Sequence, residues 1–248
     1  MLSSRAVMTT QRRLLLISNG SELIGDNPTE FFHDSLRDFL GARVRRVLFV
    51  PFAAVTRTED EYAERVRKHF GPHGYEVESL HEASDARAVV ERAEAFAVGG
   101  GNTFKLLRGL YEAGVVEPMR ARARLGVPYV GWSAGSNVAC PTLRTTNDMP
   151  IVEPPTFEAL NLVPFQINPH YTDFHPPGHM GETRDERLVE FVHANPGVRV
   201  VGLREGTMLR VEGEGVRLLG GKPARHFRKG EQPRDIAPEE SFDFLLKE

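Results

Sequence analysis

Residues 127–135 read VPYVGWSAG, an apolar run followed by a serine with a glycine two residues away on either side. The run over residues 127–132 is continuous, which is typical of a strand buried on both faces of a sheet. A short helix is predicted over residues 134–139, and it ends before Pro141, which cannot continue a helix. The chain therefore turns sharply from strand to helix at Ser133, as in the strand–helix units of a parallel sheet.

The same order of strand and helix recurs along most of the chain. Short apolar runs predict strands, and stretches with a helical period or a capping pattern predict helices. We expect a doubly wound, mostly parallel α/β sheet flanked by helices, with a C-terminal β-hairpin formed by the last two strands. The predicted strands cover residues 14–18, 47–52, 75–80, 95–98, 127–132, 165–168, 198–203, 207–211 and 216–219. The predicted helices cover residues 29–40, 58–70, 84–93, 102–125 with a break near Gly114, 134–139 and 184–194.

Length and composition narrow the class of protein. A chain of 248 residues that is 40% hydrophobic and 26% charged is typical of a globular protein with a sizeable core. Because no repeat or linker interrupts it, we expect residues 14–248 to form a single domain and residues 1–13 to form a disordered or extended N-terminal segment. The net charge of −3 gives no electrostatic reason to expect a nucleic acid or an anionic membrane as partner.

The sequence also suggests a compartment. The chain has one cysteine, Cys140, so an intramolecular disulfide is excluded and a reducing environment is expected. No run approaches the ~20 apolar residues that a membrane span needs. The first dozen residues lack the apolar region of a secretory signal. We therefore expect a cytoplasmic protein.

The spacing of Gly131, Ser133 and Gly135 matches the pattern G-x-S-x-G. In this pattern a tight turn lifts the serine hydroxyl above the carboxyl edge of the sheet, and the small neighbours leave room for the turn. The following helix N-terminus offers amide donors near the hydroxyl. An ordinary Gly/Ser turn is the alternative, but the strand before and the helix after favour Ser133 as a nucleophile.

A serine nucleophile needs a base at neutral pH, and His170 is the leading candidate among the nine histidines. His170 follows the strand predicted over residues 165–168, so it should reach the carboxyl edge, where ligands bind in open α/β sheets. A structural histidine is the alternative. His175 and His179, in the next loop, are weaker candidates, and we expect His226 to lie in a polar tail segment.

Two carboxylates are candidates for orienting a histidine base. Asp148 lies in the loop after the Ser133 helix, and Glu205 ends another predicted strand. Both could reach the carboxyl edge, so the sequence leaves the choice between them open.

Two backbone amides are candidates for an oxyanion hole. Ala134 follows the nucleophile, and Gly101 closes a glycine run between a predicted strand and a predicted helix. A phosphate loop is the alternative, but the chain lacks G-x-G-x-x-G and a following Lys-Ser/Thr. No metal site is predicted, because His170, His175 and His179 lack the H-E-x-x-H spacing and no cysteine cluster is present.

Several longer strings resemble peptidase E, the α-aspartyl dipeptidase group of the S51 serine peptidases. The resemblance covers nearly the whole chain, except the first dozen residues and the segment 225–229. The strings, in chain order, are LLLISN at 14–19, VGGGNTF at 98–104, GWSAGSN at 131–137, RTTNDMPIV at 144–152, QINPHY at 166–171 and GETR at 181–184.

The resemblance implies a serine exopeptidase that cleaves dipeptides with an N-terminal aspartate, without a cofactor. Carried over by position, Ser133 is the nucleophile and His170 the base. The family's relay acid is usually given as the aspartate that matches Asp148, but the glutamate that matches Glu205 has also been proposed. Gly101 and Ala134 match the oxyanion donors.

A small peptide substrate of this kind needs a cation for its aspartate side chain, and Arg184 and Arg144 flank the matched motifs. His179 and Glu182 are secondary candidates, with Glu182 placed to meet the substrate's free amine. The walls that restrict the site to short peptides would come from residues 141–164 or from a second copy of the chain in a homodimer.

Three other functions stay open at this point. A cyanophycinase-like enzyme would attack β-linked aspartyl-arginine polymer. A class I glutaminase-like domain would use cysteine where this chain has Ser133. A non-catalytic domain would bind small anions at the glycine run over residues 99–102.

Overall fold

The computed structural model describes residues 11–178 and 180–247. Residues 1–10, which make up most of the expected N-terminal segment, and His179 lie outside the described residues. The first described strand begins at Arg13. Among the described residues, no helix has the length and apolar character that crossing a membrane requires.

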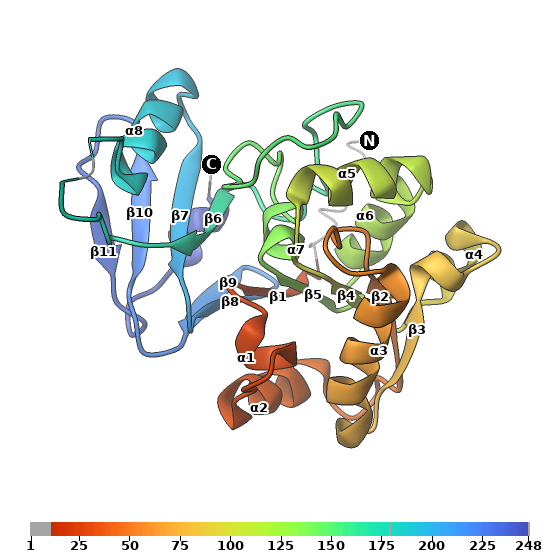
Figure 1. The fold of residues 1–248 in the computed structure, drawn as a ribbon. Helices are drawn as coiled ribbons and strands as arrows, with labels where there is room; N and C mark the ends of the chain where they lie inside the picture. The colour runs from red at the N-terminus through yellow and green to blue at the C-terminus, as the bar shows by residue number, and fades with distance from the viewer. Residues whose placement is uncertain (1–10, 179, 248) are drawn as a thin grey trace, which may run out of the picture.

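The larger sheet has seven strands in the order β3-β2-β4-β5-β1-β8-β9 (Figure 1). The first five of these strands are parallel, and β8 and β9 form an antiparallel hairpin that pairs with β1. This arrangement confirms the predicted α/β class with its C-terminal hairpin. The strands are β1 (Arg13–Ile17), β2 (Arg46–Val50), β3 (Glu76–Ser79), β4 (Phe96–Val98), β5 (Tyr129–Trp132), β8 (Met208–Glu212) and β9 (Gly215–Leu219).

Helices cover both faces of this sheet, because alternate side chains of each apolar strand point to opposite faces. Leu14 and Leu16 pack into the core beneath α4 (Ala86–Arg92), α5 (Thr103–Glu112) and α6 (Val116–Arg124). Leu15 and Ile17 pack into the opposite core with α1 (Ser21–Ile24), α2 (Glu30–Leu40) and α3 (Glu59–Phe70). The helix that follows β5 is α7 (Ala134–Asn137).

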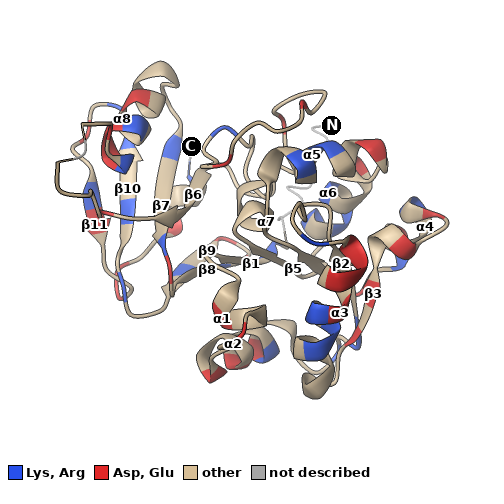
Figure 2. Ribbon diagram, in the orientation of Figure 1, with Lys and Arg blue, Asp and Glu red and all other residues tan. Residues whose placement is uncertain are grey.

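Capping residues, terminal charges and a glycine set the helix boundaries close to where the sequence predicts them. The side chain of Thr58 accepts a hydrogen bond from the Glu61 amide, and the Glu61 carboxylate accepts one from the Thr58 amide, which completes a capping box. The first turn of α3 is acidic and its last turn is basic, as Figure 2 shows, which suits the helix dipole. Gly114, with φ of 66°, lies between α5 and α6, where the break was expected.

A second sheet of four strands, in the order β11-β10-β7-β6, lies beside the larger one (Figure 1). Two of its strands were predicted, but the separate sheet and the strands β10 and β11 were not. Helix α8 (Arg184–Ala194) packs on this sheet. The strands are β6 (Gln166–Tyr171), β7 (Arg199–Arg204), β10 (Ala224–Arg228) and β11 (Arg234–Ile236).

The expectation of a polar tail around His226 is wrong, because this segment is the strand β10. The strand reads ARHFR, and Arg225 pairs with Asp185 at 2.8 Å and with Asp235 at 3.4 Å. His226 is buried, and its Nε2 has no hydrogen-bond partner among the described residues. Charge pairing therefore allows an arginine-rich segment to form an inner strand that hydrophobicity alone does not reveal.

Candidate active site

Ser133 forms a tight turn between β5 and α7. Its φ of 52° and ψ of −112° are unusual for a residue with a side chain, and its amide donates to the carbonyl of Ile17 at 3.0 Å. A Cβ at Gly135 would come within 2.0 Å of the Val98 carbonyl oxygen, so glycine is required there. The neighbouring glycine thus permits the backbone that exposes the Ser133 hydroxyl.

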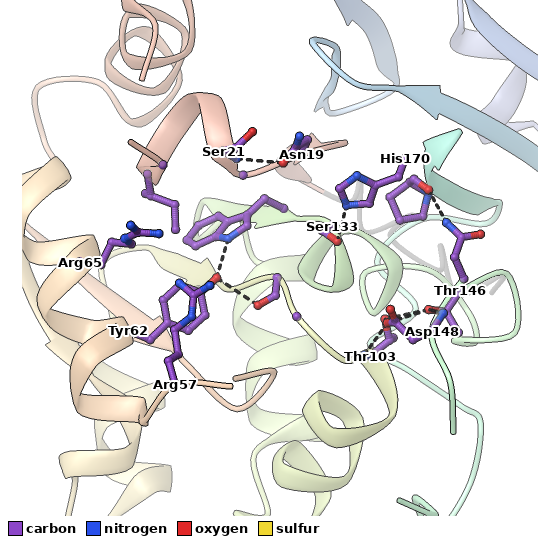
Figure 3. A pocket seen from close by; sticks show the side chains of 18 of the residues that line it. Asn19, Ser21, Arg57, Tyr62, Arg65, Thr103, Ser133, Thr146, Asp148 and His170 are labelled. Carbon is purple, nitrogen blue, oxygen red and sulfur yellow. Dashed lines mark hydrogen bonds between the residues drawn. The ribbon is translucent and has the colours of Figure 1, made fainter. Parts of the chain in front are cut away.

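His170 lies against this hydroxyl, with its Nε2 2.8 Å from Ser133 Oγ (Figure 3). His170 has φ of 54°, and the pairing of β6 with β7 shifts register between Pro169 and Tyr171. The His170 residue therefore sits in an irregular turn of its strand, which aims the ring at the larger sheet.

Ser18 secures this turn from the larger sheet. The side chain of Ser18, which follows β1 and is fully buried, accepts a hydrogen bond from the His170 amide at 3.0 Å. The same hydroxyl donates to the Leu203 carbonyl at 2.6 Å. One serine therefore ties the end of β1 to the ends of β6 and β7.

Tyr171 secures the turn from the other side. The Arg204 guanidinium lies 5.1 Å from the centre of the Tyr171 ring and pairs with Asp173 at 2.9 Å. The Tyr171 hydroxyl donates to Asp173 and Asp185. Burial, together with these carboxylates, raises the pKa of Tyr171, so the phenol stays a donor.

Glu205 is the carboxylate that contacts the histidine. Its Oε1 lies 2.6 Å from His170 Nδ1, so the ring has Ser133 on one side and Glu205 on the other. Glu205 follows β7, which pairs in parallel with β6, and this pairing brings Glu205 and His170 to the same end of the second sheet.

Asp148, the other candidate acid, makes different contacts. Its Oδ2 accepts hydrogen bonds from the Thr103 amide at 2.7 Å, the Thr103 hydroxyl at 2.6 Å and the Thr146 hydroxyl at 3.0 Å (Figure 3). These bonds fasten the loop after α7 to the first turn of α5. The structure therefore differs from the pairing of Asp148 with His170 that the family resemblance favours, because α5 engages this carboxylate.

The glycine run before α5 lies next to the nucleophile. Gly101 has φ of 136°, and a Cβ there would lie 2.2 Å from the Ala53 carbonyl oxygen. A Cβ at Gly100 would lie 2.9 Å from the Ser133 Cβ. Among the described residues, no backbone hydrogen bond outside the helices and strands has the Gly101 or Ala134 amide as its donor. Gly101 lines the cavity at Ser133, and Ala134 directly follows the nucleophile.

A cavity of about 560 Å³ opens at Ser133. Ser133, His170, Gly101 and Asp148 line it, together with Arg57, Arg65, Tyr62, Trp132 and the start of α1 (Figure 3). This volume lies within the range of small-molecule sites.

The described candidates for substrate binding, Arg144, Arg184 and Glu182, are not among the residues that line this cavity. Arg144 and Arg184 line a neighbouring cavity of about 510 Å³, on the other side of the segment Thr146 to Asp148. Arg184 Nη1 lies 3.2 Å from Asn168 Oδ1, and burial lowers the pKa of Arg184. Glu182 is exposed and lies 3.7 Å from Arg187.

Sequence reasoning did not identify Arg57 and Arg65. Arg57 directly precedes the N-cap of α3, and Arg65 lies within that helix. The fold brings both arginines to the Ser133 cavity, where Tyr62 of α3 contacts Trp132 at the end of β5. The spacing of Arg57 and Arg65 in the sequence does not indicate this position.

A metal could be held elsewhere in the described part of the chain, by Asp60, His81 and Glu82. His81 Nε2 lies 2.9 Å from Asp60, and both Glu82 oxygens accept from Arg67. These groups are already paired with one another or with Arg67, and they are not among the residues that line the Ser133 cavity.

Residues 14–219 match the family model of peptidase family S51. The chain belongs to this family. A peptidase E of Nostoc sp. is 48% identical over 236 residues, which cover 95% of this chain and 97% of the relative. A probable alpha-aspartyl dipeptidase of Drosophila melanogaster is 49% identical over 243 residues, which cover 97% and 100%.

Two solved structures show the same fold. A peptidase from an acI-B1 actinobacterium superposes with a TM-score of 0.68 at 18% identity, over 94% of this chain and 97% of that one. A putative peptidase E from Listeria monocytogenes superposes with a TM-score of 0.60 at 20% identity, over 84% and 98%.

Proposed function

We propose that this chain is a serine dipeptidase that hydrolyses dipeptides with an N-terminal aspartate through an acyl-enzyme on Ser133. The observation that carries the proposal is the line of three side chains, in which His170 lies 2.8 Å from Ser133 and 2.6 Å from Glu205. The names of the S51 relatives, peptidase E and probable alpha-aspartyl dipeptidase, support the substrate class.

In acylation, His170 Nε2 takes the proton of the Ser133 hydroxyl as Oγ bonds to the peptide carbonyl carbon. The carbonyl oxygen becomes an oxyanion, and the Gly101 and Ala134 amides donate to it. His170 then gives its proton to the leaving nitrogen as the carbon–nitrogen bond breaks. Glu205, at Nδ1, keeps the ring in the required tautomer and stabilises the imidazolium.

In deacylation, a water molecule takes the place of the leaving amine. His170 removes a proton from this water as its oxygen attacks the aspartyl ester, and the same two amides hold the second oxyanion. His170 then protonates Ser133 Oγ, and free aspartate leaves. The base, its carboxylate and the oxyanion amides thus serve both halves of the reaction.

The test is a hydrolysis panel of Asp-Leu, Asn-Leu, Glu-Leu and β-Asp-Arg with the purified protein and its Ser133→Ala variant. We expect the wild type to cleave Asp-Leu best and Ser133→Ala to lose turnover. Preferential cleavage of β-Asp-Arg would assign the chain to cyanophycinase-like chemistry instead. Absence of turnover with a folded wild type would favour an anion-binding domain.

We also infer that the reaction takes place in the cytoplasm. The single cysteine, Cys140, is buried and free, which suits a reducing compartment.

A further inference from the structure

Two arginines line the Ser133 cavity on the side of α3, and they differ in their partners. Arg65 Nη2 lies 2.6 Å from the carboxylate of Asp26. For Arg57, no carboxylate of the described residues lies within ion-pair distance, although the side chain is exposed to the cavity (Figure 3). Arg57 is therefore a cation in the substrate cavity without a counter-ion from the described part of the protein.

The guanidinium of Arg57 rests on an aromatic platform. Its carbon lies 5.0 Å from the centre of the Tyr62 ring. Stacking on a ring face holds a guanidinium in place while its N–H donors, which lie in the plane of the group, stay free for a ligand. A carboxylate can accept two parallel hydrogen bonds from such a group.

The Tyr62 ring is fixed by hydrogen bonds to residues next to the proposed catalytic groups. The Tyr62 hydroxyl accepts from Trp132 Nε1 at 2.8 Å and donates to the Gly100 carbonyl at 3.1 Å. Trp132 precedes the nucleophile, and Gly100 precedes the proposed oxyanion donor. Burial raises the pKa of Tyr62 to about 12, so the hydroxyl keeps its proton at neutral pH. Any group bound by Arg57 is therefore held in a fixed relation to Ser133.

We propose that Arg57 binds a carboxylate of the substrate. The inference rests on the proposed dipeptidase function, under which the cavity receives an Asp-X dipeptide. Such a peptide carries two carboxylates, the aspartate side chain and the C-terminus, and both present the same chemistry to a guanidinium. Arg144 and Arg184 contact Asn195 and Asn168 in the neighbouring cavity. Among the described residues, Arg57 and the paired Arg65 are the arginines and lysines that line the Ser133 cavity.

The experiment compares the wild type, Arg57→Gln and the control Arg87→Gln. Arg87 is an exposed arginine of α4 that pairs with Glu91 and does not line the cavity, so its replacement makes the same change in net charge. The substrates are Asp-Leu, Asp-Leu amide and Asn-Leu. KM and kcat are measured for each, and slow substrates are quantified as competitive inhibitors of Asp-Leu hydrolysis.

We expect Arg57→Gln to raise KM for Asp-Leu roughly 10- to 100-fold, the range for a hydrogen bond to a charged group, with a smaller change in kcat. The penalty should disappear for Asp-Leu amide if Arg57 reads the C-terminus, or for Asn-Leu if it reads the side chain. Arg87→Gln should match the wild type on all three substrates.

An equal effect of Arg57→Gln on all three substrates, or no effect beyond that of Arg87→Gln, would overturn the assignment. Circular dichroism and thermal unfolding of each variant would exclude a folding defect as the cause. Failure of the proposed function has a different signature, because the folded wild type itself would then leave Asp-Leu intact.

Discussion

Glu205 Oε1 lies 2.6 Å from His170 Nδ1, so the carboxylate beside the histidine comes from the end of β7. The nucleophile comes from the larger sheet, whereas the base and its carboxylate come from the smaller one. The catalytic geometry that we propose is therefore set by the junction between two sheets.

Glu205→Gln should abolish most of the activity while leaving the fold intact. An amide at this position would stabilise the wrong tautomer of His170 and would not stabilise the imidazolium. We expect kcat for Asp-Leu to fall by roughly 10⁴-fold, the scale seen when a relay acid is replaced by its amide, with little change in KM. Steady-state kinetics check this, and a variant with near wild-type kcat would show that Glu205 does not act on the base.

Asp148→Ala should also lower the activity, but by a different route. Removing the carboxylate leaves the Thr103 amide and hydroxyl without their acceptor and loosens the turn that carries Gly101. We expect kcat to fall by up to about 10²–10³-fold, the cost of losing one oxyanion donor. Steady-state kinetics check this, and a fall in kcat as large as that of Glu205→Gln would instead place Asp148 in the relay.

Ser18→Ala should lower both the unfolding free energy and kcat, because Ser18 holds the turn that carries His170. The substitution leaves the His170 amide and the Leu203 carbonyl unpaired, which costs about 1–3 kcal/mol of unfolding free energy. Because the turn that aims His170 loosens, kcat should fall while KM changes little. The matched control is Ser79→Ala, since Ser79 is equally buried and its hydroxyl bonds to His81, away from the cavity.

Chemical denaturation and kinetics on both serine variants check this prediction. Ser79→Ala should lose stability without losing kcat. If the two variants kept the same kcat, the Ser18 hydroxyl would have no part in placing the base.

His226 should make the stability of the protein depend on pH. Burial lowers the pKa of His226 from 6.5 to about 4, despite the carboxylate of Glu231 at 4.0 Å. The unfolded chain therefore binds a proton at this site below about pH 6.5, while the folded chain does so only near pH 4. The stability contributed by the neutral ring is complete above pH 6.5 and is lost as the pH falls toward 4.

The comparison is thermal unfolding of the wild type and His226→Gln across this pH range. The difference in melting temperature between the two proteins should change in favour of the variant as the pH falls from 6.5 to 4. A constant difference would show that His226 titrates normally in the folded chain.

Most parallel strands of the larger sheet could be predicted from sequence, because β1, β2, β4 and β5 are short apolar runs, such as residues 14–17, in a chain that alternates strand and helix patterns. The position of Ser133 could be predicted for the same reason, because a strand pattern precedes it and a helical pattern follows it. β10 could not be predicted in this way, because its arginines hide an inner strand whose charges are balanced by distant acids.

The sequence could not predict whether Asp148 or Glu205 contacts His170, and the reason is different. Both residues could reach the carboxyl edge of a sheet, and only the parallel pairing of β6 with β7 brings Glu205 to His170. Likewise, Arg57 looks like an ordinary residue before a helix cap, and only the packing of α3 turns it toward the cavity.

The most direct test of the central claim is covalent. During turnover of Asp-Leu, rapid quenching followed by peptide mass spectrometry should find an aspartyl group on Ser133 of the wild type and none in Ser133→Ala, which should also release no leucine. Hydrolysis by Ser133→Ala at the wild-type rate, or an aspartyl group on another residue, would contradict the account.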